Sequence, residues 1–181
     1  MPTVNLLPNA DISNSPAWTI SSGSDVYAML DDDDSGHVIS DSSDIEATAA
    51  GKVCIVAMQD LDSGLSGATI NSVTAVVKHN SRTRGQTYVI NTAIIIGSVL
   101  YEENTGTVPS NASWQTTTFT TRTTSDGVHA WTFADINGLR LGLELASHSG
   151  GTTGITYAYY IIDYTAAVAA TDNAVFFGAN F

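Results

Sequence analysis

Apolar and polar residues alternate along most of this chain with the two-residue period of β-strands. The segment LRLGLEL shows the period most clearly, because the four leucines at 139, 141, 143 and 145 share one face. The same period runs through GKVCIVAMQ, SVTAVVKHN, TYVINTAIIIGSVLYE, SWQTTTFTTRT and ITYAYYIIDYT. In GKVCIVAMQ both faces are apolar, which is typical of a strand covered on both sides.

Only one segment has the pattern of a helix. In WTFADING, Thr132 is followed three residues later by Asp135, an arrangement that resembles a capping box, and Gly138 can end the turn. About eight strands separated by short turn signals therefore predict an all-β fold, an antiparallel β-sandwich or jelly roll with one short helical turn.

The two ends of the chain differ from the body in composition. Residues 1–17 contain three prolines, two of them close to polar turns, and are expected to form an extended N-terminal arm. Residues 18–165 are expected to form a single jelly-roll domain, and residues 166–181 a C-terminal arm. That arm is rich in small apolar residues and contains Phe176, Phe177 and Phe181, which we expect to pack on the domain or on a neighbouring molecule.

The chain is strongly acidic, with a net charge of −12 although only 13% of its residues are charged. The first 51 residues contain no Lys or Arg. Such a surface repels phosphate groups, so neither nucleic acid nor a membrane surface is expected as a partner. Three of the six basic residues lie close together, at Lys78, Arg82 and Arg84, and could orient a subunit interface.

Cys54 is the only cysteine, which excludes an intrachain disulfide and a multi-cysteine zinc site. Its apolar neighbours predict a small buried side chain. The N-terminal residues lack the pattern of a signal peptide, and the sequence has no uninterrupted apolar run of membrane-spanning length. These features predict synthesis and folding in a reducing cytoplasm.

The stretch MLDDDDSGHVIS raises the question of calcium. Asp31, Asp33 and Ser35, followed by Gly36, match the first half of a calcium-binding loop. The second half does not match, because Ser42 stands where the loop requires a bidentate Glu. Two readings stay open: a calcium site at Asp31, Asp33 and Ser35, or a solvated acidic turn that discourages sheet-edge aggregation.

No catalytic motif is recognisable in the sequence. The four histidines lie in four separate segments, no Gly-x-Ser-x-Gly elbow is present, and no phosphate-binding loop is present. No pair of carboxylates suggests a glycosidase. Trp18, Trp114 and Trp131 either fill the core or stack on sugar rings, and the core is the preferred reading. We therefore expect no enzymatic activity and no cofactor apart from the calcium considered above.

Three segments together resemble a known protein family: LLPNADISNSPAWTISSGSDVYAMLDDDD, WTFADINGLRLGLEL and ITYAYYIIDYT. Their order is similar to that in small jelly-roll virion proteins of tailed bacteriophages, often marine ones. The resemblance spans most of residues 5–165 and implies a β-sandwich structural protein of the capsid or tail, without catalysis.

Two functional hypotheses follow from the sequence and this resemblance. The first is a capsid decoration, or cement, protein that bridges capsomers. It would be made in the host cytoplasm, reside in the virion, assemble as a homotrimer and contact the major capsid protein. The second is a tail-fibre or surface-displayed module that recognises carbohydrate, for which the fold class alone is weak support.

Overall fold

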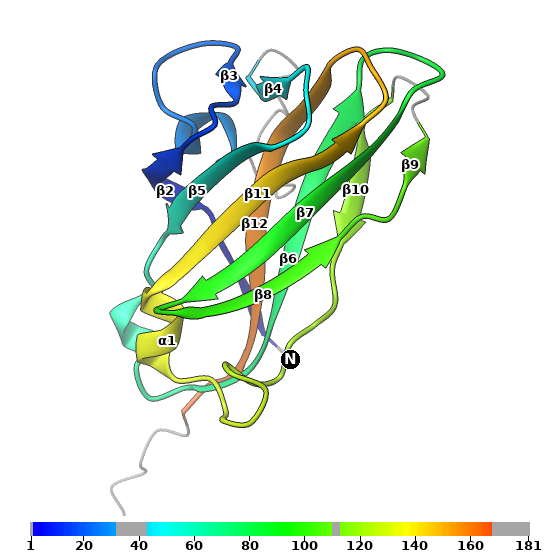
Figure 1. Ribbon diagram of the computed structural model, residues 1–181. Helices are drawn as coiled ribbons and strands as arrows, with labels where there is room; N and C mark the ends of the chain where they lie inside the picture. Colours follow the sequence, from blue (N-terminus) through cyan, green and yellow to red (C-terminus); the bar gives the residue numbers. More distant parts are fainter. Residues whose placement is uncertain (1, 32–42, 110–112, 168–181) are drawn as a thin grey trace, which may run out of the picture.

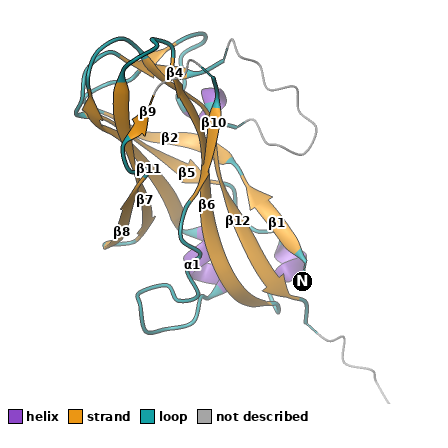
Figure 2. Cartoon of the chain, turned by 90° about the vertical axis from the view of Figure 1, so that its right-hand side faces the viewer, coloured by secondary structure: helices purple, strands orange, loops and turns teal. Residues whose placement is uncertain are grey.

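The computed structural model describes residues 2–31, 43–109 and 113–167, which form two antiparallel β-sheets packed face to face (Figures 1 and 2). The first, called the β6–β12 sheet, contains β1 (Thr3–Leu6), β3 (Thr19–Ile20), β4 (Ile45–Ala47), β6 (Thr69–Ser81), β10 (Gln115–Thr118) and β12 (Thr153–Thr165). The second, called the β5–β11 sheet, contains β2 (Pro8–Asn14), β5 (Lys52–Met58), β7 (Thr87–Ile96), β8 (Val99–Asn104), β9 (Val108–Pro109) and β11 (Leu139–His148). The expected antiparallel β-sandwich is confirmed.

Each sheet is organised around one long central strand. In the β6–β12 sheet the order is β10-β6-β12-β4-β3, and β1 continues the edge beyond β4 by pairing with the far end of β12. In the β5–β11 sheet the order is β2-β5-β11-β7-β8, and β9 pairs with the first residues of β7. Almost all pairings join strands distant in sequence, so the outer faces are composite surfaces.

The core lies between the sheets and is built largely by the predicted alternation. Leu139, Leu141, Leu143 and Leu145 all point inward from β11 and are almost fully buried. Cys54 packs in the same core on β5, and burial raises the pKa of its thiol, as expected for a small buried side chain. The other face of β5 is only half-buried among the described residues, so the expectation of a strand covered on both faces is not met.

β12 differs from the simple alternation because it contains a β-bulge. The sequence pattern places Ile155 on the same face as Tyr157 and Tyr159, but the pairing register with β6 shifts between Ile155 and Tyr157. Ile155 therefore points into the main core, whereas Tyr157 and Tyr159 pack with Val76 in a separate cluster on the outer face. A one-residue shift moves the following side chains to the opposite face.

The N-terminal arm expected over residues 1–17 is wrong. Residues 3–6 form β1, paired with β12, and residues 8–14 form β2, paired with β5. Pro8 is tolerated because it is the first residue of an edge strand, where its missing N–H disrupts no ladder. Leu6 is almost fully buried, so this segment is part of the folded domain.

The long candidate strand TYVINTAIIIGSVLYE is two strands. Gly97 has a φ of 57°, a conformation that glycine adopts without steric cost, and the Gly97–Ser98 turn joins β7 to β8 as a hairpin. This hairpin brings the residues of β8 onto the same outer face as those of β7.

The short helix α1 (Phe133–Asn137) lies at one end of the sandwich (Figure 1). Thr132 and Asp135 form the predicted capping box, and Gly138 caps the last turn. Two 3-10 turns, η1 (Tyr27–Met29) and η2 (Ser63–Leu65), complete the elements. None of the helices in the described ranges is long and apolar enough to cross a membrane.

Candidate functional site on the outer face of the β5–β11 sheet

A shallow hollow of about 180 Å³ lies in the middle of this outer face. Its base is formed where the strand register places Gly142 of β11 opposite Ala93 of β7. On its other side Gly142 pairs with Ile55 of β5, and on its other side Ala93 pairs with Glu102 of β8. A depression remains because Gly142 and Ala93 are small and lie side by side between larger neighbours.

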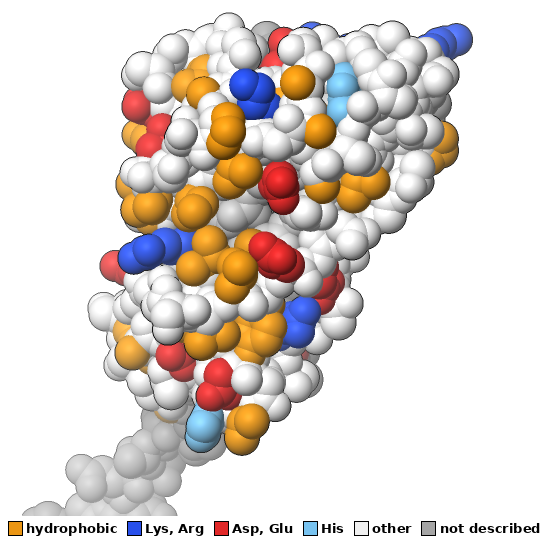
Figure 3. Space-filling model, viewed as in Figure 1, with side chains coloured by type: hydrophobic (Ala, Val, Ile, Leu, Met, Phe, Trp, Pro, Cys, Tyr) orange, Lys and Arg blue, Asp and Glu red, His pale blue; other side chains and the backbone are white. Residues whose placement is uncertain are grey.

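The walls of the hollow are aliphatic. Val53 and Ile55 line it from β5, Ile95 from β7 and Leu100 from β8. Leu100 is 52% exposed, whereas the other three are half-buried. The lining residues that the structure describes include no aromatic side chain. Figure 3 shows the hydrophobic side chains gathered across this face, with acidic groups between them.

Gly142 keeps the hollow open. A Cβ at this position would lie 3.2 Å from Ala93 Cβ and 3.5 Å from Ile95 Cδ1. The first distance is tighter than ordinary van der Waals contact, so Ala93 would have to shift by a few tenths of an ångström, whereas the second is an ordinary contact. The size of the side chain at position 142 is therefore limited by the space on the outer face.

Polar groups border the hollow on one side. Asn91 Nδ2 donates a hydrogen bond of 2.9 Å to Glu144 Oε2, which fixes both side chains across β7 and β11. Glu102 is exposed beside them. The border therefore offers carboxylate oxygens as hydrogen-bond acceptors and a negative charge beside an aliphatic surface.

A second hollow of about 310 Å³ lies toward the β2 edge of the same sheet. Ala57 and Arg140 line it and lie two residues beyond Ile55 and Gly142 on the same two strands. Ile12, 49% exposed on β2, also lines it. Together the two hollows make an uneven surface that extends from β8 to β2.

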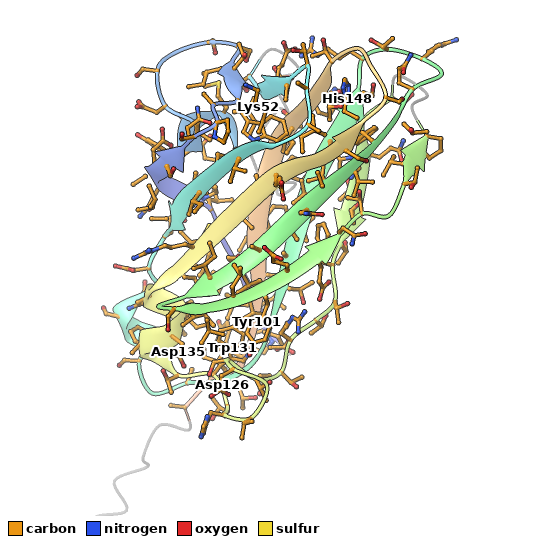
Figure 4. The ribbon with its side chains drawn as sticks, in the orientation of Figure 1. Lys52, Tyr101, Asp126, Trp131, Asp135 and His148 are labelled. Atoms are coloured by element: carbon orange, nitrogen blue, oxygen red, sulfur yellow. The ribbon has the colours of Figure 1, made fainter. Side chains whose placement is uncertain are left out.

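The histidines with perturbed pKa values do not converge on this surface. His79 is buried and hydrogen-bonded to Tyr88 Oη and Thr117 Oγ1, both at 2.8 Å, and burial lowers its pKa to about 4. His129 is exposed, and its hydrogen bond to Asp126 raises its pKa. His148 and Asp126 lie at opposite ends of the sandwich (Figure 4). His79 and His129 are therefore each held by their own local hydrogen bonds.

The predicted basic cluster does not form one patch of unengaged cations. Arg82 Nη2 lies 2.6 Å from Asp44 Oδ2 and Arg82 Nε 2.8 Å from Glu46 Oε1. Lys78 Nζ lies 5.4 Å from the centre of the Tyr157 ring, a cation–π contact. Arg84 is exposed in the turn between β6 and β7. The proposed role of these residues in subunit docking stays a prediction.

Most of the other predicted site residues lie outside the described residues. This holds for Asp33 and Ser35 of the calcium candidate and for Phe176, Phe177 and Phe181 of the C-terminal arm. Asp31 is described and forms an isolated β-bridge with Tyr157. Within residues 2–31, 43–109 and 113–167, no group of three or more His, Cys, Asp or Glu side chains is placed to hold a metal ion.

Two of the three tryptophans lie in the core, as the preferred interpretation of the sequence predicts. Trp18 and Trp131 are buried in the main core, and Trp131 Nε1 donates to the carbonyl oxygen of Arg122 at 2.9 Å. Trp131 lies near Tyr101 at the α1 end (Figure 4), where Arg122 stacks 4.6 Å above the Tyr101 ring. Trp114 is half-buried on the other sheet, where its Cη2 would lie 3.5 Å from a Cβ at Gly154.

The residues of the hollow were missed by sequence reasoning. The available signal was the apolar outward face of two segments, Val53 and Ile55 in KVCIVAM and Ile95 in TAIII. The position of Gly142 beside Ala93 depends on strand register, which alternation alone does not specify.

The sequence matches no protein-family model and no curated protein. Among solved structures, the chain is similar to the C-terminal CBM6 of LamC, a marine laminarinase from Zobellia galactanivorans, with 12% identity, a TM-score of 0.41, and coverage of 89% of this chain and 98% of that one. It is also similar to the Stig cyclase Fisc from Fischerella sp. TAU, with 13% identity, a TM-score of 0.40, and coverage of 90% and 98%. At these values the similarities carry no functional argument.

Proposed function

We propose that this protein is a non-catalytic structural component of a tailed-phage virion, most specifically a capsid decoration protein that bridges capsomers. Its partners would be further copies of itself, as a homotrimer, and the major capsid protein. Two observations support the proposal: the resemblance of three sequence segments to jelly-roll virion proteins, and the apolar outer face of the β5–β11 sheet.

The outer face is the observation that carries the proposal. An antiparallel sheet in a sandwich ordinarily presents polar side chains to solvent on its outer side. Here β5, β7 and β8 present Val53, Ile55, Ile95 and Leu100 around a hollow. A contiguous apolar surface bordered by polar groups is typical of a protein–protein contact. Aliphatic side chains suit a protein partner, since they offer no aromatic face on which a sugar ring stacks.

The alternative is a carbohydrate-binding module of a tail fibre. One observation favours it: Asn91, Glu102 and Glu144 place hydrogen-bonding groups beside the hollow, and such groups can bind sugar hydroxyls. A glycan array probed with the purified protein, with and without calcium, tests this role. Specific binding that is lost on substitution of Glu144 by Gln would favour it over the assembly role.

The leading proposal is tested by locating the protein on particles. Virions released by cells that produce this chain would be labelled with gold-conjugated antibody raised against the purified protein. We expect label distributed over the head. Label confined to the tail or its fibres would favour the alternative, and particles without label would exclude a virion role.

A further inference from the structure

We propose that the hollow on the β5–β11 sheet binds the Phe176–Phe177 pair from the C-terminal segment of a neighbouring copy of this chain. The inference deepens the proposed function and rests on it, since it identifies the contact through which copies would associate. The contact would be heterologous, between the tail of one copy and the sheet of the next, and a ring of three such contacts would close a trimer.

The size of the hollow suits an aromatic ring. Its volume is about 180 Å³, and an apolar cavity of about 150 Å³ in another protein holds benzene. Gly142 and Ala93 form a base without bulky side chains, so a ring can approach the backbone of β7 and β11.

The chemistry of the segment complements the walls. Residues 173–181, NAVFFGANF, contain no charged side chain, and they would place no ionised side chain beside the aliphatic residues of the hollow. In an extended segment Phe176 and Phe177 would point to opposite sides, so one ring would enter and the other would remain at the rim. Glu102 and Glu144 at the rim can accept hydrogen bonds from backbone amides of such a segment.

The position of the end of β12 favours a neighbouring copy over the same chain. β12 belongs to the β6–β12 sheet, and Ala167 lies beside Gly67, where a Cβ on the glycine would be 3.3 Å from Ala167 Cβ. β12 and β8 lie on opposite sides of the sandwich (Figure 2). Phe176 lies nine positions after Ala167, and this stretch of chain spans at most about 30 Å. To reach its own hollow the segment must pass around the end of the sandwich that carries α1, whereas a neighbour can present its hollow directly.

Photo-crosslinking of the full chain tests the contact. A benzophenone-bearing phenylalanine analogue would replace Phe177 in one preparation and Phe176 in another, each mixed with ¹⁵N-labelled wild-type protein. We expect crosslinks that join light and heavy chains and map to residues 53–55 or 91–102. Crosslinks that map to the β6–β12 sheet, or that form only within one chain, would overturn the proposal.

Two variants separate this inference from the proposed function. Ala93→Leu fills the hollow, and the double substitution Phe176→Ser with Phe177→Ser removes the proposed ligand; each should weaken self-association at least about tenfold in sedimentation equilibrium. Circular dichroism confirms that the variants fold. If only Ala93→Leu weakens association, the outer face is an interface but the tail is not its ligand. If neither does, both the inference and the role of this face in assembly are wrong.

Discussion

The buried imidazole of His79 should make the stability of this protein depend on pH in a defined direction. Its two ring nitrogens are each 2.8 Å from a hydroxyl oxygen, on Tyr88 and Thr117, and no carboxylate among the residues that the structure describes is hydrogen-bonded to the ring. Burial lowers its pKa from 6.5 to about 4, because the charged form would lose its hydration without gaining a counter-ion.

Proton linkage gives the sign and the size of the effect of His79 on stability. The unfolded chain takes up the proton on this histidine near pH 6.5 and the folded chain only near pH 4, so between these values the unfolded state binds more protons. The contribution of neutral His79 to stability is therefore fully present above pH 6.5 and is lost as the pH falls toward 4. A pKa difference of this size corresponds to about 3 kcal/mol.

Urea unfolding followed by tryptophan fluorescence measures the effect, since Trp18 and Trp131 are buried in the core. Carboxylates titrate in the same range, so the informative quantity is the difference between wild type and His79→Gln. We expect the variant's free energy of unfolding to fall less steeply from pH 7 to pH 4. His129→Gln is the matched control: the pKa of the exposed His129 is raised, so its small contribution is lost as the pH rises. Parallel curves for wild type and His79→Gln would refute the reasoning.

Three further predictions concern the β6–β12 sheet and the aspartate run. Arg82→Met should lower the free energy of unfolding by about 2 kcal/mol, because it leaves the fully buried Asp44 without its cation. The loss stays moderate because the Arg82 side chain is itself 42% exposed. Arg84→Met, measured in the same urea titration, should have little effect. Gly154→Ala should lower the free energy of unfolding by about 1–3 kcal/mol, since its Cβ would meet Asp44 Oδ2 at 2.6 Å. Gly138→Ala should cost much less, because its Cβ would lie 3.5 Å from the nearest atom. Equal losses in the two variants would contradict the packing argument. Addition of a chelator should leave Tm unchanged if Asp31, Asp33 and Ser35 belong to a solvated turn, and a lower Tm in differential scanning calorimetry would establish a calcium site there.

Sequence patterns predicted those elements whose side chains alternate without interruption. The four leucines of β11 and the capping box at Thr132 are local features, and the structure confirms both. The N-terminal strands were not predicted, because PTVNLLPNADISN contains prolines and only short apolar runs, and its pairing partners lie far away in sequence.

The remaining differences arise from long-range pairing. The bulge at Thr156 exchanges the faces of β12, yet nothing in ITYAYYIIDYT marks it, since apolar residues occupy both faces. The role of Arg82 was likewise hidden, because Asp44 and Glu46 are brought to it by the pairing of β4 with β12. The hollow depends on Gly142 lying opposite Ala93, a consequence of register that no single segment contains.

The most direct test of the proposed assembly role is a sedimentation-equilibrium comparison of wild type, Leu100→Lys and Val128→Lys. Both residues are exposed, at 52% and 78%, but only Leu100 lines the hollow, whereas Val128 lies in the loop after Asp126. We expect wild type and Val128→Lys to self-associate with the same affinity and Leu100→Lys to remain a monomer. Association of Leu100→Lys equal to that of wild type, or a wild type that stays monomeric, would contradict the assignment of the β5–β11 face as the surface through which copies assemble.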